Sequence, residues 1–572
     1  MEHSSSLPLA SDELERVDGP RDLRKVAARL QANVTAAGDR WKRLPLVTIS
    51  QLVLSNAGVR GDRIAFQDDD RAVDYRQLER RTRSLAGRLG AEWLQPGDRA
   101  AILLGNRVEA MESYIAIVRT GAVGVPLNPL MSDAELSYVL QDSGCRVIIT
   151  DRANAERHRL MVPFDRAPEV VVVGDARVPE GALSFESLAD VEAPAPPPRD
   201  DLALDDVAWI FYSSGTTGQP KGVLSSQRSY LWSASASYLS VLGLSEADRM
   251  LLPVPLYHAF AYSLCVGVLQ AGATAHIMTG FDADEVAALL DTGSYTLLAG
   301  VPTMFHHLVT TARRRDAAPV GPRICIVAGA PSSSELRRSW EETFHVPLVD
   351  GYGATELCGV ATLNWPAENR TGESCGLPLR GLDVRLMDPD TGADVSSSGE
   401  GEMWFSGPSV MSGYHNLPKE TATTLVDGWY RTGDLAGTDR AGRLTVTGRI
   451  KEIIIRGGEN IYPAEIEHVI ARIPSVADVA VAAKNHEELG QVPVAFVVAE
   501  GGAINVQAIF DACRTQLTAF KVPSEIHQVD VVPRSSSGKI LRRQLWERPT
   551  RLLGTADASS FLNEHCQPKG RP

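Results

Sequence analysis

Cysteine is scarce in this chain, and positive charge is in deficit. The seven cysteines are spread over 572 residues and form no C-x-x-C pair. Disulfide frameworks and structural zinc sites need paired or closely spaced cysteines, so neither is expected. The 57 Lys and Arg stand against 71 Asp and Glu, which leaves a formal charge of −14. Because nucleic-acid partners require a broad basic surface, none is predicted.

Long apolar runs are also missing. The first nine residues contain no basic stretch followed by an apolar one, so no secretory signal is predicted. The most apolar long window, 260–278, contains Gln270 and His276, which suits a buried helix and strand better than a membrane span. Hydrophobic residues still make up 44% of the chain, enough for a large core. We therefore expect a soluble cytoplasmic enzyme without stable membrane insertion.

Alternating helix and strand patterns fill the chain from about residue 46 onward, which predicts parallel βαβ units in an α/β fold. Several apolar runs lead directly into loops that contain glycine. In α/β proteins ligands bind at the carboxyl ends of parallel strands, so such loops are candidate walls of one site. Strands are expected at 100–104, 145–150, 207–212, 324–327 and 346–349.

The pattern restarts after about residue 450. Pro463 opens a helix with apolar residues at helical spacing, and strands are expected at 476–481, 492–498 and 526–532 around a helix at 506–517. This predicts a small α+β domain. The expected organisation is a polar N-terminal extension (1–45), a large domain of layered α/β sub-domains (46–449), the small domain joined by a hinge (450–548), and a tail without an interpretable motif (549–572).

The strongest motif is the segment S-S-G-T-T-G-Q-P-K-G, which begins at Ser213 directly after an expected strand. Its glycines let backbone N–H groups converge, its hydroxyl residues add donors, and its lysine supplies positive charge, all of which suit a polyphosphate. The order of residues differs from Walker A. The residues predicted to bind phosphate are Ser213, Ser214, Gly215, Thr216, Thr217, Gly218 and Lys221.

This loop resembles the phosphate loop of the adenylate-forming superfamily, which includes acyl- and aryl-CoA synthetases, adenylation domains of nonribosomal peptide synthetases, and beetle luciferases. Four further motifs occur in the family's order: G-Y-G-A-T-E at 351–356, Y-R-T-G-D at 430–434, G-R-I-K-E at 448–452 and P-R-S-S-S-G-K-I at 533–540. Taken alone, the first two could be ordinary turns. Their combination in this order favours the family, which implies the fold described above.

The resemblance implies a role for each matching residue. Tyr352 would stack on adenine, Thr355 would contact the α-phosphate, and Glu356 would bind magnesium. Asp434 would accept hydrogen bonds from both ribose hydroxyls, as a carboxylate can. Lys539 would be the catalytic lysine. The further positions implied for nucleotide, hinge or pantetheine contacts are Gly329, Ala330, Pro331, Asp350, Gly351, Gly353, Arg449, Lys451, Gly457 and Gly458.

His258 follows Tyr257 at a position that bears histidine or an aromatic residue in the family. It could orient the substrate carboxylate or gate the pantetheine channel, and a core histidine is nearly as well supported. With Lys539, Thr355 and Glu356 it completes the predicted catalytic set.

The resemblance also implies the reaction and its cofactors. ATP and Mg²⁺ would serve to adenylate a carboxylic acid with release of pyrophosphate, after which the thiol of CoA would take the acyl group and release AMP. Between these steps the small domain would turn about a hinge at Lys451. The glycines at 457–458 favour CoA over an acyl carrier protein. Alternatives are an acyl-AMP ligase that loads a carrier protein, a luciferase-like oxygenase, and a non-catalytic nucleotide-binding relative; a homodimer is left open.

The walls expected around the acyl group are mainly apolar, and no acid aligns with the one that adenylation domains use to hold an α-amino group. We therefore expect an apolar aliphatic, alicyclic or aryl carboxylic acid. The wall candidates are Val301, Pro302, Phe305, Ala328 and Val360.

Overall fold

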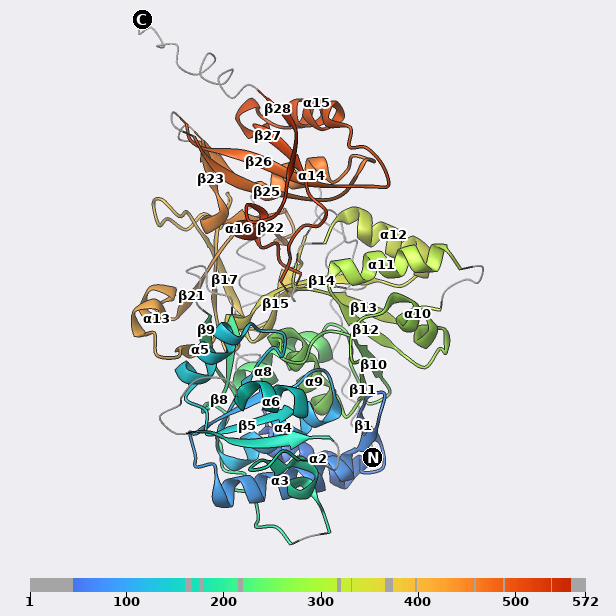
Figure 1. The fold of residues 1–572 in the computed structure, drawn as a ribbon, viewed down its shortest axis with the longest axis vertical. Coiled ribbons are helices and arrows are strands. Elements are labelled where there is room, and N and C mark those ends of the chain that lie inside the picture. Colours follow the sequence, from blue (N-terminus) through green and yellow to red (C-terminus); the bar gives the residue numbers. More distant parts are fainter. Residues whose placement is uncertain are drawn as a thin grey trace, which may run out of the picture.

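The computed structural model describes residues 45–556, apart from 160–166, 175–177, 193, 214–219, 316–319, 331, 366–373, 397–398, 457–458, 487–488 and 536–537. In this part of the chain, helices cover four β-sheets, three of them in a large N-terminal domain and one in a small C-terminal domain (Figure 1). The predicted α/β class with a small C-terminal domain is confirmed. The domain boundaries themselves stay predictions, and the N-terminal extension lies almost wholly outside the described residues.

The first large sheet has eight strands in the order β19-β9-β8-β4-β3-β5-β6-β7. The strands expected at 100–104, 145–150 and 207–212 are all present in it, with ends shifted by one or two residues. Its strands are β3 (Arg99–Leu103), β4 (Val123–Pro126), β5 (Val147–Asp151), β6 (Glu169–Val173), β7 (Leu183–Ser184), β8 (Val207–Ser213), β9 (Lys221–Ser226) and β19 (Gly413–Tyr414).

Local signals explain where its helices begin and end. In the helix over 75–92, Asp74 caps the first turn by accepting from the backbone N–H of Gln77. The helix over 108–120 stops at Gly121, whose φ of +83° places it in the left-handed region. The helices of this part are α2 (Ile49–Arg60), α3 (Tyr75–Glu92), α4 (Val108–Thr120), α5 (Asp133–Ser143), α6 (Arg152–Arg159) and α7 (Phe185–Ala189).

The second large sheet has nine strands in the order β16-β15-β14-β13-β12-β10-β11-β1-β2. Its strands are β1 (Ile64–Gln67), β2 (Ala72–Asp74), β10 (Arg249–Leu252), β11 (Thr274–Ile277), β12 (Leu297–Gly300), β13 (Ile324–Val327), β14 (Leu348–Ala354), β15 (Gly359–Leu363) and β16 (Leu377–Pro378). The helices around it are α8 (Gln227–Ala234), η1 (Ser235–Leu239), α9 (Ala259–Ala271), α10 (Ala283–Asp291), α11 (Pro302–Arg313) and α12 (Ser334–Phe344).

One expectation in this sheet was wrong. The segment after residue 349 was predicted as a loop, whereas β14 continues to Ala354 and pairs antiparallel with β15. The glycines do not break the strand, because Gly353 allows the backbone of Gly359 to approach closely. The G-Y-G-A motif is therefore one strand of a hairpin.

A smaller antiparallel sheet completes the large domain. Its strands are β17 (Asp383–Met387), β18 (Gly401–Ser406), β20 (Leu425–Val426), β21 (Trp429–Thr438) and β22 (Leu444–Arg449), and α13 (Pro418–Thr424) lies beside them. The β21–β22 hairpin makes Asp434 the register partner of Arg449. Residues of two consecutive motifs, 15 positions apart in the sequence, thus become direct neighbours.

The C-terminal sheet is built from β23 (Ile454–Arg456), β24 (Glu459–Ile461), β25 (Val476–His486), β26 (Gly490–Ala499), β27 (Glu525–Gln528) and β28 (Arg551–Thr555). Helices α14 (Pro463–Ile470), α15 (Val506–Gln516) and α16 (Arg542–Leu545), with η4 (Ala519–Lys521), accompany it. Strand β28 comes from the segment for which no structure was predicted, and it pairs antiparallel with β27. The strand expected at 526–532 ends already at Gln528.

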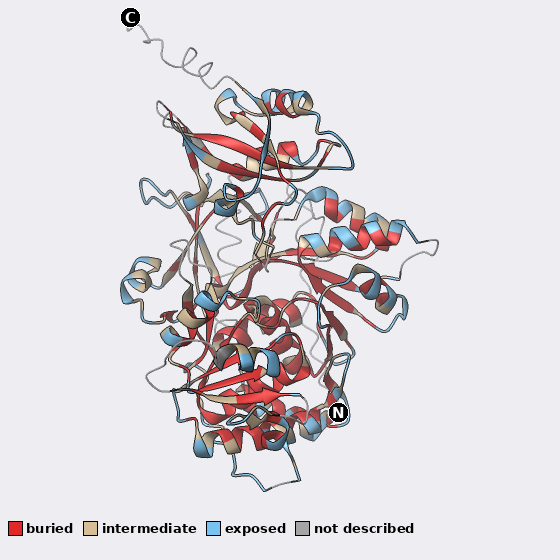
Figure 2. Ribbon diagram, viewed as in Figure 1, coloured by how far each residue is buried: buried red, intermediate tan, exposed pale blue. Residues whose placement is uncertain are grey.

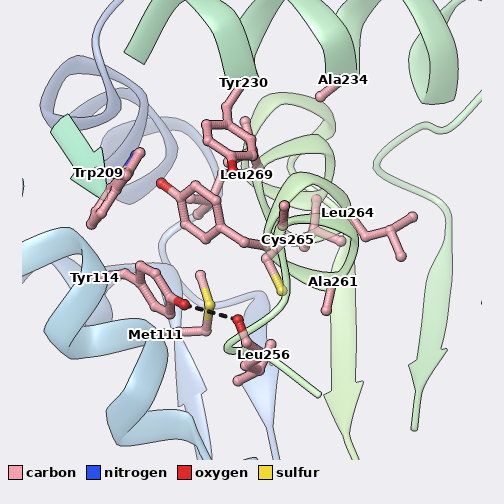
Figure 3. Packing of buried hydrophobic residues seen from close by; sticks show 14 of the residues in the cluster. Met111, Tyr114, Trp209, Tyr230, Ala234, Leu256, Ala261, Leu264, Cys265 and Leu269 are labelled. Carbon is pink, nitrogen blue, oxygen red and sulfur yellow. Dashed lines mark hydrogen bonds between the residues drawn. The ribbon is translucent and has the colours of Figure 1, made fainter. Parts of the chain in front are cut away.

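The main core lies between the two large sheets (Figure 2). Tyr114 from α4, Trp209 from β8 and Tyr230 from α8 meet there (Figure 3). The ring centroids of Tyr114 and Trp209 are 5.2 Å apart in an edge-to-face arrangement, and the Tyr114 hydroxyl donates to the carbonyl of Leu256 at 2.8 Å. Large buried rings packed edge to face fix the sheets against each other and so fix the strand ends that carry the site.

No helix among the described residues is long and apolar enough to cross a membrane. The window 260–278 forms helix α9 followed by strand β11, as predicted.

Candidate active site

The predicted phosphate loop connects two antiparallel strands. Strand β8 ends at Ser213 and β9 begins at its register partner Lys221, so the two ends of the loop are adjacent. The Lys221 ammonium lies 5.2 Å from the centroid of the Tyr414 ring. Ser214, Gly215, Thr216, Thr217 and Gly218 lie outside the described residues. Their phosphate contacts stay predictions.

Glu356 lies on the short helix η2 (Thr355–Leu357), which follows β14 and begins with Thr355. The Tyr414 hydroxyl donates to its Oε1 at 3.0 Å, and the Ser213 hydroxyl donates to the same oxygen at 3.4 Å. Among the described residues no donor reaches its Oε2. A carboxylate oxygen left open beside hydroxyl groups and a phosphate loop fits Mg²⁺, which prefers oxygen ligands and shares them with phosphates.

Tyr352, Asp434 and Arg449 form one hydrogen-bonded group. The Tyr352 hydroxyl donates to Asp434 Oδ2 at 2.7 Å, and Arg449 Nε donates to Asp434 Oδ1 at 2.6 Å. Burial acts to lower the pKa of Arg449, but the Asp434 carboxylate outweighs it and raises that pKa above its ordinary value. Burial, and then the charge of Asp434, raises the pKa of Tyr352. The aspartate of this group can exchange its protein donors for hydroxyl donors of a ligand.

Glu402 holds the turn that presents Asp434. Its Oε1 accepts from the backbone N–H of Gly433 at 3.0 Å, while its Oε2 accepts from Trp404 Nε1 at 2.8 Å and pairs with Arg431 at 3.2 Å. Gly433 has φ of +70°, a conformation that glycine adopts without strain. The turn is therefore fixed from strand β18.

Lys539 comes from the small domain and reaches the same site. In its turn the backbone N–H of Ser535 donates to the Lys539 carbonyl at 2.8 Å. A Cβ built on Gly538 would lie 4.0 Å from the Cβ atoms of Ala330 and Val301, so the turn lies against the large domain. Although Lys539 is itself exposed, desolvation by the surrounding protein and then the charge of Arg449 lower its pKa, against the opposing charges of Asp434 and Glu356.

The turn that carries Lys539 is braced from the small domain. Arg534 donates to the Gly538 carbonyl at 3.1 Å and to Asp478 Oδ1 of β25 at 2.8 Å. Arg542, which begins α16, pairs with Glu452 at 2.9 Å and also with Glu467 of α14. Glu452 ends η3 (Ile450–Glu452), the short helix that contains the predicted hinge residue Lys451.

Other predicted residues lie beside the lysine turn, in a buried ion pair, at the surface or outside the described residues. Gly329 has φ of +92° and sits beside Ala330 near the lysine turn. Asp350 is buried, and its Oδ2 lies 3.2 Å from Arg337 Nε in an ion pair that directs the carboxylate toward α12. Lys451 is exposed. Pro331, Gly457 and Gly458 lie outside the described residues.

Four of the five wall candidates divide into two groups, and the fifth, Pro302, begins α11. Val301, Ala328 and Val360 are buried at the carboxyl ends of β12 and β13 or on β15. Phe305 is instead packed edge-to-face on Trp340 with ring centroids 4.9 Å apart and is wholly buried, so its ring belongs to the core between α11 and α12.

His258 precedes α9 and lies close enough to Lys539 to feel its charge. Burial, and then that charge, lower its pKa from 6.5 to about 4. Because this value lies below that of an unfolded chain, the neutral ring contributes stability that is fully present above pH 6.5 and is lost as the pH falls toward 4. The imidazole is therefore a neutral hydrogen-bonding group near pH 7.

We expect His258→Gln to leave the shape of the pH profile of kcat/KM unchanged between about pH 5.5 and 8, because a neutral ring has no proton to lose there. Initial rates of adenylate formation across this range would measure it. An inflection near pH 6.5 in the wild type that vanishes in His258→Gln would contradict the neutral assignment.

Gly353→Ala is expected to destabilise the β14–β15 hairpin. The new Cβ would lie 2.0 Å from the carbonyl oxygen of Gly359, and such overpacking costs about 1–3 kcal/mol. A lower melting temperature and weaker ATP binding should follow. Gly437→Ala is the matched control, because a Cβ there meets no atom within 4 Å. Equal melting temperatures for the two variants would contradict the packing argument.

Sequence reasoning missed Tyr414, Glu402 and Glu452. Tyr414 donates to the predicted residue Glu356, which lies 58 residues away in sequence. Glu402 accepts from Gly433, the neighbour of Asp434, across 31 residues, and Glu452 accepts from Arg542, which follows the Lys539 turn, across 90 residues. Spacing patterns within a motif carry no signal for such contacts.

Two family models match the chain. The AMP-binding enzyme model covers residues 54–415, and the model for the AMP-binding enzyme C-terminal domain covers 465–539. Among curated proteins, the chain is 38% identical over 553 residues to chalcone synthase cfoA of Aspergillus candidus, which covers 91% of the chain but only 19% of that protein. The chain thus spans about a fifth of that relative's length.

Other relatives match over nearly their whole length. A feruloyl-CoA synthase from an Amycolatopsis species is 36% identical over 480 residues, 83% of this chain and 94% of that protein. The structure of o-succinylbenzoate CoA synthetase from Bacillus subtilis in complex with ATP and magnesium superimposes with a TM-score of 0.75 at 29% identity, covering 86% of this chain and 99% of that one.

Proposed function

The chain belongs to the AMP-binding enzyme family, and on that premise we propose that it is an ATP-dependent acid–thiol ligase that forms an acyl-CoA. The observation that carries the proposal is the position of the Lys539 turn, in which Gly538 lies against Ala330 and Val301 of the large domain. The charges of Arg449, Asp434 and Glu356 accordingly act on the pKa of the lysine. A lysine from the small domain thus shares one site with a candidate ribose carboxylate and a candidate metal carboxylate.

In the first step, a carboxylate oxygen of the acid attacks the α-phosphorus of ATP, and the bond to pyrophosphate breaks. Lys539 neutralises the charge that builds on the attacking and α-phosphoryl oxygens, and Lys221 with the phosphate loop holds the departing pyrophosphate. Asp434 and Arg449 orient the ribose, and Tyr352 stacks on the base. Thr355 contacts the α-phosphate. No protein nucleophile takes part.

The carboxylate of Glu356 would hold Mg²⁺ through its open Oε2. When bound, the ion supplies positive charge that offsets the charge on the phosphate oxygens. Ser213 and Tyr414 fix the other carboxylate oxygen, which restricts the direction in which Oε2 points.

In the second step, a thiolate attacks the carbonyl carbon of the acyl-adenylate, and AMP leaves. We propose that the small domain turns at Lys451 between the steps, which withdraws the Lys539 turn and brings the Gly457–Gly458 segment to the site. CoA is the proposed acceptor. The second candidate is a thiol on a carrier protein, and it is favoured by the match to one fifth of a much longer synthase. A cytoplasmic location and a homodimer stay predictions.

We propose an aryl carboxylic acid as substrate, which narrows the class expected from the sequence. Feruloyl-CoA synthase and o-succinylbenzoate CoA synthetase are named for acids that carry a benzene ring. The apolar side chains of Val301, Ala328 and Val360 suit a ring better than a charged group.

An acid panel with each acceptor tests the proposal. Aryl, aliphatic and amino acids would be supplied with ATP and Mg²⁺, and AMP would be measured with CoA, with a phosphopantetheinylated carrier protein, or with neither. We expect AMP and a CoA thioester with aryl acids. Thioester on the carrier protein alone would favour the second candidate, and reaction with amino acids alone would overturn the substrate class.

A further inference from the structure

Tyr414 is a buried aromatic residue between two charged groups of the site. It lies on β19, where it is the register partner of Val223 on β9, the strand that begins at Lys221. Only 9% of its surface is exposed. Its position is therefore fixed by the same strand that fixes the lysine.

The two ends of this side chain meet opposite charges. The ring lies under the Lys221 ammonium, 5.2 Å from ring centroid to nitrogen, and the hydroxyl donates to Glu356 Oε1 at 3.0 Å. The electron-rich face of a tyrosine ring attracts a cation, whereas its O–H attracts a carboxylate.

Without the Tyr414 side chain between them, the Lys221 ammonium and the Glu356 carboxylate could come into direct contact. An ammonium and a carboxylate in a site with little water tend to form a direct ion pair, which would occupy the groups needed for phosphate and metal. Among the described residues, Lys221 and Glu356 form no ion pair within 4.0 Å. Each instead contacts Tyr414.

We propose that Tyr414 is a positioning residue that holds Lys221 and Glu356 apart, so that the lysine faces the phosphates and Oε2 of Glu356 faces Mg²⁺. This inference rests on the proposed function, because it assumes that ATP and Mg²⁺ bind here. Ser213 donates to the same Oε1 at a longer 3.4 Å and supports Tyr414.

Substitutions can separate the two contacts. Tyr414→Phe keeps the ring under Lys221 and removes the hydrogen bond to Glu356, whereas Tyr414→Leu removes both. Tyr75→Phe is the matched control: its buried hydroxyl donates to the Ala273 carbonyl at 2.7 Å within the N-terminal part of the core. It therefore loses a buried tyrosine hydroxyl without touching the site.

Calorimetric titration of the full chain with ATP, in EDTA and in excess Mg²⁺, supplies a readout that does not depend on turnover. The ratio of the two Kd values measures the gain from the metal. In Tyr414→Phe we expect this ratio of Kd values to fall about tenfold, because removal of a residue that orients a metal ligand weakens metal binding by this order. The Kd in EDTA should stay unchanged. In Tyr414→Leu the Kd in EDTA should also rise, by about threefold. Tyr75→Phe should match the wild type in both.

An unchanged metal gain in Tyr414→Phe would overturn the inference, as would equal losses in Tyr414→Phe and Tyr75→Phe. A rise of the Kd in EDTA for Tyr414→Phe would also oppose it, because the ring contact to Lys221 remains in that variant. If the wild type binds no ATP, the proposed function fails instead, so the two failures are distinct.

Discussion

Lys539→Ala is expected to slow formation of the acyl-adenylate by about 10²–10³-fold, the range for removal of one placed electrostatic stabiliser. The step from a supplied acyl-adenylate to the thioester should keep its rate, because in the proposed mechanism the lysine turn leaves the site before that step. If the small domain moves between the steps and Lys539 acts only in the first, its removal should slow only the first half-reaction.

Pyrophosphate release measures the first half-reaction, and AMP release from synthetic acyl-adenylate with CoA measures the second. Lys484→Ala is the control, since this lysine pairs with Glu525 at 2.6 Å on the same small domain and is 46% exposed. Equal losses in both half-reactions of Lys539→Ala, or no loss in the first, would contradict the assigned role.

Asp434→Ala is expected to weaken ATP binding by about 10²-fold. Its carboxylate is 6% exposed and pairs with Arg449 while accepting from Tyr352. Removal of Asp434 leaves the Arg449 guanidinium without its carboxylate partner, a loss that water offsets in part because Arg449 is 39% exposed, and it also deletes the acceptor for the ribose.

Calorimetric Kd values for ATP would measure this effect. Asp439→Ala is the control on the same hairpin, because Asp439 forms a half-exposed pair with Arg443 at 2.8 Å. We expect that control to change the Kd less than twofold, in line with the small free energy of exposed pairs. An Asp434→Ala variant that binds ATP as the control does would contradict the ribose assignment.

The sequence predicted those features of the fold that local chemistry determines. The helix that Pro463 opens follows from the proline at its first position and from its apolar spacing, and β8 follows from the apolar run that leads into the phosphate loop. The continuation of β14 through Gly351 and Gly353 was missed, because pairing with β15 overrides the usual tendency of glycine to end a strand.

The site was predictable to the extent that its residues lie within motifs. Asp434 and Arg449 were both proposed as ribose contacts, but their mutual ion pair depends on the register of β21 and β22, which no spacing rule gives. The ion pair of Asp350 with Arg337 arises from the packing of α12 on β14. Tyr414 was missed for the same reason, since its role depends on the pairing of β19 with β9.

The most direct measurement follows a labelled oxygen. An aryl acid labelled with ¹⁸O in its carboxylate would be incubated with the protein, ATP, Mg²⁺ and CoA, and the products would be analysed by mass spectrometry. If a carboxylate oxygen attacks the α-phosphorus, AMP must carry one ¹⁸O and the acyl-CoA must retain the other. Formation of AMP without the label, or of labelled phosphate with ADP, would contradict adenylation as the chemistry of this site.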